Sequence, residues 1–197
     1  MRLIIASNNA NKIREIRQIL GARYELFSLK DAGIDIDVVE DGDTFAENAI
    51  KKAEEVLHAA QDFDAALADD SGLVVDALDG APGVYSARFA GEGKSDAANN
   101  EKLLRLMQDI PWENRTCRFA CAVAFARKDQ PTICEMGYCE GRLLDAPRGE
   151  NGFGYDPLFY YEPAGMSFAE IPAEEKNQVS HRRNALENLK TALQKEG

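Results

Sequence analysis

Residues 3–20 read LIIASNNANKIREIRQIL, and this stretch carries the pattern from which the fold class is inferred. The apolar run Leu3–Ala6 predicts a short buried strand, and the polar residues that follow predict a turn. Isoleucines then recur at helical spacing up to Leu20, and Gly21 is a helix stop signal. The chain is therefore predicted to begin with a strand, a polar loop and a helix.

The same reading along the chain predicts an α/β protein. Thr44 and Glu47 have the spacing of a capping box, so a second helix is expected from Thr44. Further helices are expected after Ser95 or Asp96 and after Ser180. A hairpin-like segment at Asp129–Pro131 predicts that part of the sheet is antiparallel. The predicted strands cover residues 65–68, 73–75, 116–127, 132–139, 141–144 and 157–161.

Composition limits the classes of function. The chain has 197 residues, with 23 Lys plus Arg against 34 Asp plus Glu, and a formal charge of −11. This balance argues against a protein that coats nucleic acid or binds a membrane through basic residues. No run approaches the roughly 18 apolar residues that span a bilayer. The start, Met1–Ala6, turns polar too early for a signal peptide, so a cytoplasmic protein is expected, with residues 1–197 as a single domain.

The four cysteines predict free thiols rather than a metal site. Cys117 and Cys121 fall in a predicted strand, which separates them by roughly 13 Å. Two sulfurs that share one zinc ion would lie within about 4 Å of each other. Cys134 and Cys139 complete the set, and reduced thiols in or near the core are the favoured interpretation.

The polar loop after the first strand is a candidate phosphate site. The start of a helix offers free backbone N–H groups and a positive dipole end, and both suit phosphate. The alternative is an N-cap followed by a solvated lysine, and the segment lacks the glycines of a P-loop. The candidate residues are Ser7, Asn8, Asn9, Ala10, Asn11 and Lys12.

An acidic segment follows the predicted strand at residues 65–68. Asp69 and Asp70 are adjacent carboxylates at its expected end, Ser71 follows them, and Gly72 permits a sharp turn. Such a pair favours a nearby cation, and Mg²⁺ takes carboxylates together with phosphate oxygens. Glu40 could reach a metal held by Asp70. The alternative is an ordinary surface turn, and Glu47 is better explained by helix capping than by metal binding.

Two later segments could complete a nucleotide site. The loop Asn151–Pro157 places two glycines around an aromatic residue, which can bring backbone amides and a stacking ring to a base. The alternative is a tight turn with a core phenylalanine. The segment Lys176–Arg183 gathers cationic and titratable side chains in an acidic protein. Arginines in the first turn of a helix oppose its dipole, which mildly favours an anion site over a solvated helix start.

Taken together, these segments resemble the inosine triphosphate pyrophosphatase family, in its bacterial dITP/XTP pyrophosphatase branch. Their order and spacing are specific, although each segment alone is weak. The matching segments are Ser7-x-Asn9-x-x-Lys12, Thr44-Phe45-x-Glu47-Asn48-Ala49, Asp69-Asp70-Ser71-Gly72-Leu73, Gly80–Arg88, Gly152–Pro157 and Ser180-His181-Arg182.

The resemblance implies an elongated mixed β-sheet flanked by helices, with two lobes and a central cleft. It implies Mg²⁺-dependent hydrolysis of ITP, dITP, XTP and dXTP to the monophosphate and pyrophosphate, by a homodimer that removes deaminated purines from the nucleotide pool. Neither nucleic acid nor a membrane is an expected partner. The implied site residues are Asp70 as catalytic base, Glu40 and Asp70 as metal ligands, and Ser7 to Lys12, Ser71, Phe153, Gly154, Tyr155, Asp156, Lys176, His181 and Arg182 around the substrate.

Base selectivity is expected to rest on the 6-oxo group of hypoxanthine and xanthine. His181, Arg182 or a loop N–H could donate to that oxygen, while Phe153 stacks on the ring. Asp156 and Lys176 are expected at the polar edge of the base pocket. Two other classes of function remain open at this point: a pyrophosphatase for pyrimidine or modified nucleotides, and a nucleotide sensor without enzymatic activity. Asp69 also remains an alternative to Glu40 as the second metal ligand.

Overall fold

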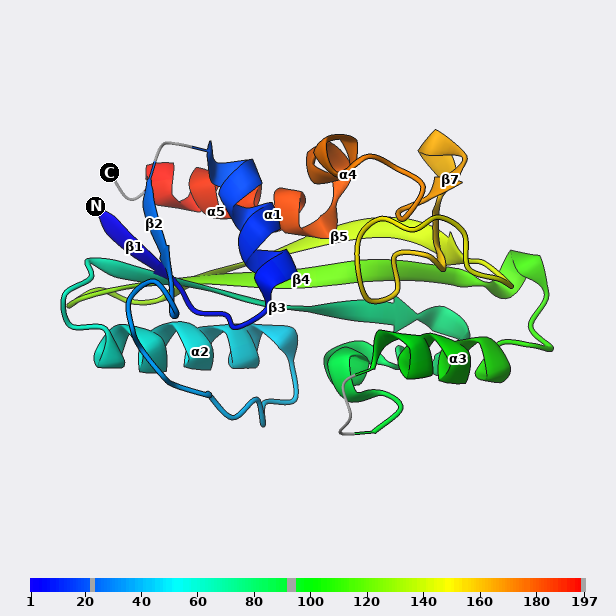
Figure 1. Cartoon of the computed structure of the whole chain (residues 1–197), viewed down its shortest axis with the longest axis horizontal. Coiled ribbons are helices and arrows are strands. Elements are labelled where there is room, and N and C mark those ends of the chain that lie inside the picture. The colour runs from blue at the N-terminus through cyan, green and yellow to red at the C-terminus, as the bar shows by residue number, and fades with distance from the viewer. Residues whose placement is uncertain (22–23, 92–94, 196–197) are drawn as a thin grey trace. The chain divides into compact units, whose positions relative to one another are not determined.

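A mixed β-sheet forms the centre of the computed structural model, which describes residues 1–21, 24–91 and 95–195. Within these ranges the sheet has seven strands, in the order β2-β1-β3-β4-β5-β6-β7 (Figure 1). The strands are β1 (Arg2–Ile5), β2 (Glu25–Ser28), β3 (Ala65–Val75), β4 (Thr116–Arg127), β5 (Ile133–Leu143), β6 (Phe159–Tyr161) and β7 (Met166–Ser167).

Both strand directions occur, as predicted. Strand β1 runs parallel to β2 and to β3, with Ile4 opposite Phe27 and Ala66. Strand β6 pairs antiparallel with both β5 and β7. The prediction of an α/β protein with a partly antiparallel sheet is therefore confirmed.

Local signals in the sequence start most of the helices. The Asn9 side chain caps α1, Thr44 and Glu47 form a complete capping box for α2, and Ser95 caps α3. Gly21, with φ of 61°, ends α1. No helix in the described ranges is long and apolar enough to cross a membrane. The α-helices are α1 (Ala10–Leu20), α2 (Phe45–Ala59), α3 (Asp96–Leu106), α4 (Ala173–Val179) and α5 (His181–Lys195). Short 3₁₀ helices are η2 (Asp76–Leu78), η3 (Gly83–Arg88), η4 (Trp112–Asn114) and η5 (Glu162–Ala164).

The chain divides into two compact units. The first contains the described residues of Met1–Asp70, Cys121–Gly137 and His181–Gly197. The second contains Ser71–Ala120 and Tyr138–Ser180, again within the described ranges.

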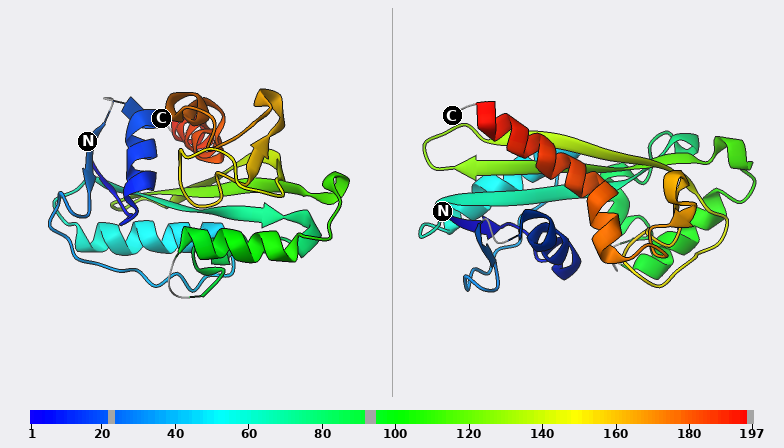
Figure 2. Two further views of the ribbon diagram at one scale, coloured as in Figure 1. Left: turned by 45° about the vertical axis from the view of Figure 1, so that its right-hand side comes forward. Right: turned by 90° about the horizontal axis from the view of Figure 1, so that it is seen from above.

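In the first unit, helices cover both faces of the strands. Ile4, Ala66 and Ala122 lie in one apolar cluster with the buried face of α2. Their neighbours in the strands point to the opposite face, as strand geometry requires. There Leu67 and Val123 pack with residues of α1 and α5. Figure 1 shows α2 on one side of these strands with α1 and α5 on the other, and the right-hand view of Figure 2 looks onto the face that α1 and α5 cover.

The second unit has its own apolar cluster. Leu103 and Met107, from α3 and the residue after it, are fully buried against Leu73 and Phe119 of the strands. Three phenylalanines, Phe119, Phe159 and Phe168, pack ring against ring, with centroids 4.6–5.9 Å apart.

Two predictions of local structure were wrong. The segment Asp69–Gly72 does not turn, because β3 continues unbroken from Ala65 to Val75. Gly72 is required for a different reason: a Cβ there would lie 2.3 Å from Ser86 Oγ and 2.6 Å from the Gly83 carbonyl oxygen. Strand β5 is likewise one strand rather than two. Helix α4, which is only seven residues long, and the short strands β2 and β7 were not predicted.

All four cysteines are free thiols, as predicted. Cys117, Cys121 and Cys139 are buried, and Cys134 is half-buried. Among the described residues, no group of three or more His, Cys, Asp or Glu side chains could hold a metal ion.

Candidate functional site

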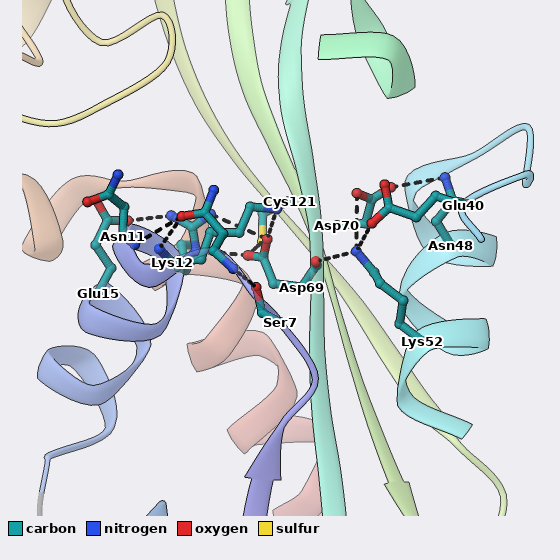
Figure 3. Close-up of polar contacts among 12 residues, drawn as sticks. Ser7, Asn11, Lys12, Glu15, Glu40, Asn48, Lys52, Asp69, Asp70 and Cys121 are labelled. Atoms are coloured by element: carbon teal, nitrogen blue, oxygen red, sulfur yellow. Dashed lines mark hydrogen bonds and ion pairs between the residues drawn. The ribbon is translucent and has the colours of Figure 1, made fainter. Parts of the chain in front are cut away.

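Two adjacent carboxylates in the middle of β3 organise the site. Asp69 and Asp70 are 1 % and 6 % exposed, so both are buried. Because neighbouring residues of a strand point to opposite faces, the two side chains enter different surroundings. Figure 3 shows Asp69 directed toward Lys12 and Cys121, and Asp70 directed toward Asn48, Lys52 and Glu40.

Asp69 is held by three donors. Lys12 Nζ lies 2.6 Å from its Oδ1, while Arg182 Nε and Cys121 Sγ donate to Oδ2 at 2.8 and 2.9 Å. Burial acts to raise the pKa of Asp69, but the charges of Arg182 and Lys12 outweigh it and hold the pKa well below its ordinary value. Asp69 is therefore a fixed anion whose oxygens are already engaged.

Arg182 connects this cluster to α1. Its side chain is 1 % exposed, and its guanidinium also contacts the carboxylate of Glu15. The two cations Lys12 and Arg182 are thus matched by the two anions Asp69 and Glu15. An arginine in the first turn of α5 opposes the helix dipole, and these carboxylates offset that cost.

Asp70 has different partners. Asn48 Nδ2 donates to its Oδ2 at 3.1 Å, and Lys52 Nζ lies 3.5 Å from its Oδ1. Lys52 also donates to Glu40 Oε1 at 2.7 Å and to the Asp69 carbonyl at 2.8 Å. Burial raises the pKa of Asp70, and the opposing charge of Lys52 does not cancel that effect. Burial acts to lower the pKa of Lys52, but Asp70 and Glu40 raise it overall, so the lysine is charged.

Lys52 was not predicted as a site residue, and Asn48 was named only within a motif of the family, without a role. Both lie on α2 beside the apolar stripe that contains Ala49 and Ala53, and both are buried. A lysine next to the core-facing stripe of a predicted helix needs a buried anion as partner, and this signal could have revealed it. Glu15 and Cys121 were also missed, since nothing near them in the sequence indicates their partners.

The donor set on the Asp70 face fits a divalent cation. Glu40 and Asp70 both approach the single ammonium group of Lys52, so this position already favours a cation. Carboxylate oxygens are the ligands that Mg²⁺ prefers in proteins. The carboxylate of Asp69 instead points to the other face and is engaged by Lys12 and Arg182, which favours Glu40 as the second ligand.

The polar loop before α1 lies next to the Asp69 cluster. Asn9 Oδ1 accepts from the backbone N–H groups of Asn11 and Lys12, so this side chain caps the helix. Ser7 Oγ accepts from the Asn9 N–H at 3.1 Å, and Asn8 Nδ2 donates to the Ile36 carbonyl. Ala10 is the first residue of α1, and Lys12 pairs with Asp69 rather than with solvent.

A cavity of about 480 Å³ opens beside this loop. Ser7 and Asn8 form part of its wall, and Arg14, Arg17 and Lys30 bring positive charge to it. The loop and the cavity together offer N–H donors and cations, the groups that bind phosphate oxygens.

The predicted base-binding residues of the second unit form a compact loop. Asp156 Oδ2 accepts from the Phe153 N–H at 3.0 Å and from Lys176 Nζ at 2.5 Å. Lys176 Nζ also lies 5.1 Å from the centre of the Phe153 ring. Tyr155 is buried, and its hydroxyl donates to the Ser86 carbonyl at 2.8 Å, so its ring belongs to the core of this unit.

The remaining predicted residues lie at element boundaries. His181 is buried at the start of α5, directly before Arg182. Ser71 is half-buried in β3, directly after Asp70. The structure thus brings Lys12, Asp69 and Arg182 together in one cluster and Glu40 and Asp70 in another, while Phe153, Asp156 and Lys176 form a third.

Comparison with known proteins identifies the family. The model of the Ham1 family matches residues 3–192 of the chain. The chain belongs to the Ham1 family. The Ham1 protein of Staphylococcus aureus has a structure that matches this one with a TM-score of 0.86 at 42 % identity, covering 100 % of both chains.

Curated relatives of this Ham1-family chain agree with the resemblance noted in its motifs. A dITP/XTP pyrophosphatase of Desulforamulus reducens is 49 % identical over 196 residues, which covers 98 % of this chain and 96 % of that protein. A dITP/XTP pyrophosphatase of Geobacter sulfurreducens is 50 % identical over 193 residues, with coverage of 98 % and 96 %. The predicted family is confirmed.

Proposed function

We propose that this protein hydrolyses ITP, dITP, XTP and dXTP to the nucleoside monophosphate and pyrophosphate, and so removes deaminated purines from the nucleotide pool. Its membership of the Ham1 family and its likeness to dITP/XTP pyrophosphatases support this proposal. The observation that carries the chemistry is the Asp70 face of β3, where a buried carboxylate of raised pKa lies beside Glu40 and a charged lysine.

The triphosphate is assigned to the loop from Ser7 to Lys12. The positive end of the α1 dipole and the ammonium of Lys12 suit phosphate oxygens. Lys12 is 15 % exposed and is the most accessible cation of the Asp69 cluster. A phosphate that engages Lys12 leaves Asp69 with Arg182 and Cys121 as partners, so the buried carboxylate keeps a positive charge beside it.

Asp70 is assigned as the general base. Its carboxylate orients a water molecule and takes one proton from it as the water oxygen attacks the α-phosphorus. The bond from the α-phosphorus to the bridging oxygen breaks, and pyrophosphate leaves with the electron pair. A raised pKa makes Asp70 a stronger base than an exposed aspartate, and Asn48 holds the carboxylate in place.

Glu40 and Asp70 would hold Mg²⁺, which supplies positive charge to the phosphate oxygens and the leaving group when it is bound. Lys52 contacts both carboxylates and keeps them paired with a cation in the protein alone. Asp69 is assigned to positioning Lys12 and Arg182 rather than to the metal.

Base selection is assigned to the loop Asn151–Pro157, called the Phe153 loop from here on, together with a hydrogen-bond donor for the 6-oxo group of the purine. His181, Arg182 or a loop N–H supplies that donor, and adenine would leave it without a partner. The Phe153 ring stacks on the purine, while Asp156 and Lys176 fix the loop through their buried ion pair.

We further propose that the protein acts as a cytoplasmic homodimer and that residues 1–197 form one catalytic domain. These assignments follow the family resemblance. Light scattering coupled to size-exclusion chromatography tests the dimer: a mass near twice the 21.7 kDa of the chain supports it, and a mass near 21.7 kDa contradicts it.

The proposed reaction is tested by incubating the protein with Mg²⁺ and ITP, with ATP and GTP in parallel, and separating the products by anion exchange. We expect IMP and pyrophosphate from ITP, with ATP and GTP largely intact. IDP and phosphate would contradict the assigned scissile bond. A wider nucleotide panel separates the alternative of a pyrimidine or modified-nucleotide pyrophosphatase, and tight ITP binding without product would favour a nucleotide sensor.

A further inference from the structure

Helix α3 holds the Phe153 loop by both polar groups of a single glycine. The N–H of Gly154 donates to Asp96 Oδ2 at 2.7 Å, and its carbonyl accepts from Asn100 Nδ2 at 3.0 Å. Asp96 and Asn100 are four residues apart, so they lie on the same face of the helix. Gly154 has φ of 61°, a backbone conformation that other residues rarely adopt.

The remainder of the loop is held from a different direction. Asp156 accepts from the Phe153 N–H and pairs with the buried Lys176, as described above. A Cβ at Gly152 would lie 2.1 Å from Asp156 Oδ2, so the turn closes tightly around this carboxylate. Phe153 is thus the residue between two anchors: the Asp156–Lys176 pair and the contacts of α3 with Gly154.

Helix α3 does not need the Gly154 contacts for its own placement. Leu103 and Met107 are fully buried at its C-terminal end. Nearer its start, the buried Asn99 donates to the Ser86 and Ala87 carbonyls and accepts from the Ala90 N–H. The Ser95 side chain caps the helix. The bonds from Asp96 and Asn100 therefore constrain the loop rather than the helix.

We propose that Asp96 and Asn100 are positioning residues for purine binding, which fix the Gly154 peptide and thereby the orientation of Phe153. This inference rests on the proposed function, because it assigns the Phe153 loop to the base of the substrate. It adds two residues of α3 to that site. The contacts described for Asp96 and Asn100 are with Gly154, whereas Asp70 and Glu40 are the residues assigned to hydrolysis.

The test compares steady-state kinetics with ITP for three variants and one control variant. Asn100→Ala and Asp96→Ala each remove one bond to Gly154, and we expect KM to rise about fivefold to tenfold while kcat stays within twofold of wild type. Asp96→Asn keeps an acceptor oxygen and is expected to restore most of the wild-type KM. Glu101→Ala, at an exposed position of the same helix, is the control and should leave both constants unchanged.

A second readout follows the hydrogen bond between the Gly154 N–H and Asp96. Hydrogen exchange of the Gly154 amide should become about tenfold faster in Asp96→Ala and return toward the wild-type rate in Asp96→Asn. The exchange measurement requires neither substrate nor enzymatic activity. A purely structural role would lower the melting temperature or the active fraction and leave KM unchanged.

Several results would overturn the proposal. These are a KM within twofold of wild type in both alanine variants, unchanged exchange at Gly154, or Asp96→Asn behaving like Asp96→Ala. Should one alanine variant fail to fold, the other still decides the outcome. A wild-type protein that makes no IMP from ITP would instead contradict the proposed function, so the two failures are distinguishable.

Discussion

Asp69 and Asp70 are neighbours in one strand and carry the same side chain, yet they differ in every property that matters for chemistry. Asp69 is engaged by Lys12, Arg182 and Cys121, and its pKa is lowered. Asp70 contacts Asn48 and Lys52, and its pKa is raised. Burial is similar for the two, so the difference arises from the charges and donors that each face of β3 supplies.

This comparison indicates a division of roles. A carboxylate whose oxygens are taken up by cations of the protein is poorly suited to bind a metal or to accept a proton. A carboxylate that contacts one amide donor and one lysine, and that lies beside a second carboxylate, can bind a metal and can accept a proton. Asp69 is therefore assigned to structure and positioning, and Asp70 to the reaction.

The largest expected effect is on turnover in Asp70→Asn. Loss of the base should lower kcat by about a thousandfold, within the range for removal of a general base. Initial rates of IMP formation measure this loss, and calorimetry with ITP should still detect binding. Turnover close to that of wild type would contradict the role of Asp70.

Asp69→Asn should instead lower stability. The variant removes the carboxylate that pairs with the buried Arg182 and with Lys12, and breaking a buried ion pair costs about 3–5 kcal/mol. Urea unfolding measures the loss. Asp70→Asn is the matched control, because it changes the same charge one residue away and should cost less. Equal losses in the two variants would contradict the division of roles.

Local sequence signals made much of the fold and of the candidate site predictable. The caps at Asn9 and Thr44 depend on groups within four residues, so the sequence identified these helix starts correctly. The paired acids of β3 and the polar loop were also found, since they follow apolar runs. These features use short-range physics that is visible in one stretch of chain.

The errors and omissions have long-range causes. The need for a glycine at position 72 of β3 arises from Ser86, fourteen residues later, whose Oγ would lie 2.3 Å from a Cβ there. Arg182 meets Glu15 across 167 residues of sequence, and Cys121 meets Asp69 across 52. No local pattern reports such partners. The opposite surroundings of Asp69 and Asp70 follow from the continuous course of β3, which the local sequence pattern does not reveal.

Phe153→Ala is expected to reverse the pattern of Asp70→Asn. Loss of a stacking ring is worth about 1–3 kcal/mol, so KM for ITP should rise roughly tenfold while kcat changes little. The comparison of kcat and KM in the two variants separates binding of the base from chemistry at the phosphate. An unchanged KM would eliminate the stacking role.

A smaller effect is expected from added Mg²⁺, which should stabilise the folded protein through Asp70 but not through Asp69. At ten times the dissociation constant, a bound cation stabilises the folded state by about 1.4 kcal/mol. Thermal unfolding with and without MgCl₂ should show this gain in wild type and in Asp69→Asn, and little gain in Asp70→Asn or Glu40→Gln. If MgCl₂ stabilised the Asp70→Asn variant as much as wild type, Asp70 would be excluded as a ligand of Mg²⁺.

The smallest expected effect concerns the thiols. Burial raises the pKa of Cys134 to about 11. Burial, together with the negative charge of Asp69, also raises the pKa of the buried Cys121 well above its ordinary value. Both thiols are therefore protonated at pH 8, and labelling by Ellman's reagent should be slow and should speed up as the pH rises. The half-buried Cys134 should react first, Cys134→Ser should lose that phase, and Cys121 should react only on unfolding. Rapid labelling of native Cys121 would contradict its buried contact with Asp69.

The most direct test of the central claim is hydrolysis of ITP by the wild-type protein in water enriched in oxygen-18, with mass spectrometry of both products. Attack on the α-phosphorus by a water molecule that Asp70 orients places one heavy oxygen in IMP and none in pyrophosphate. Label in pyrophosphate, or release of inorganic phosphate with IDP, would contradict the account.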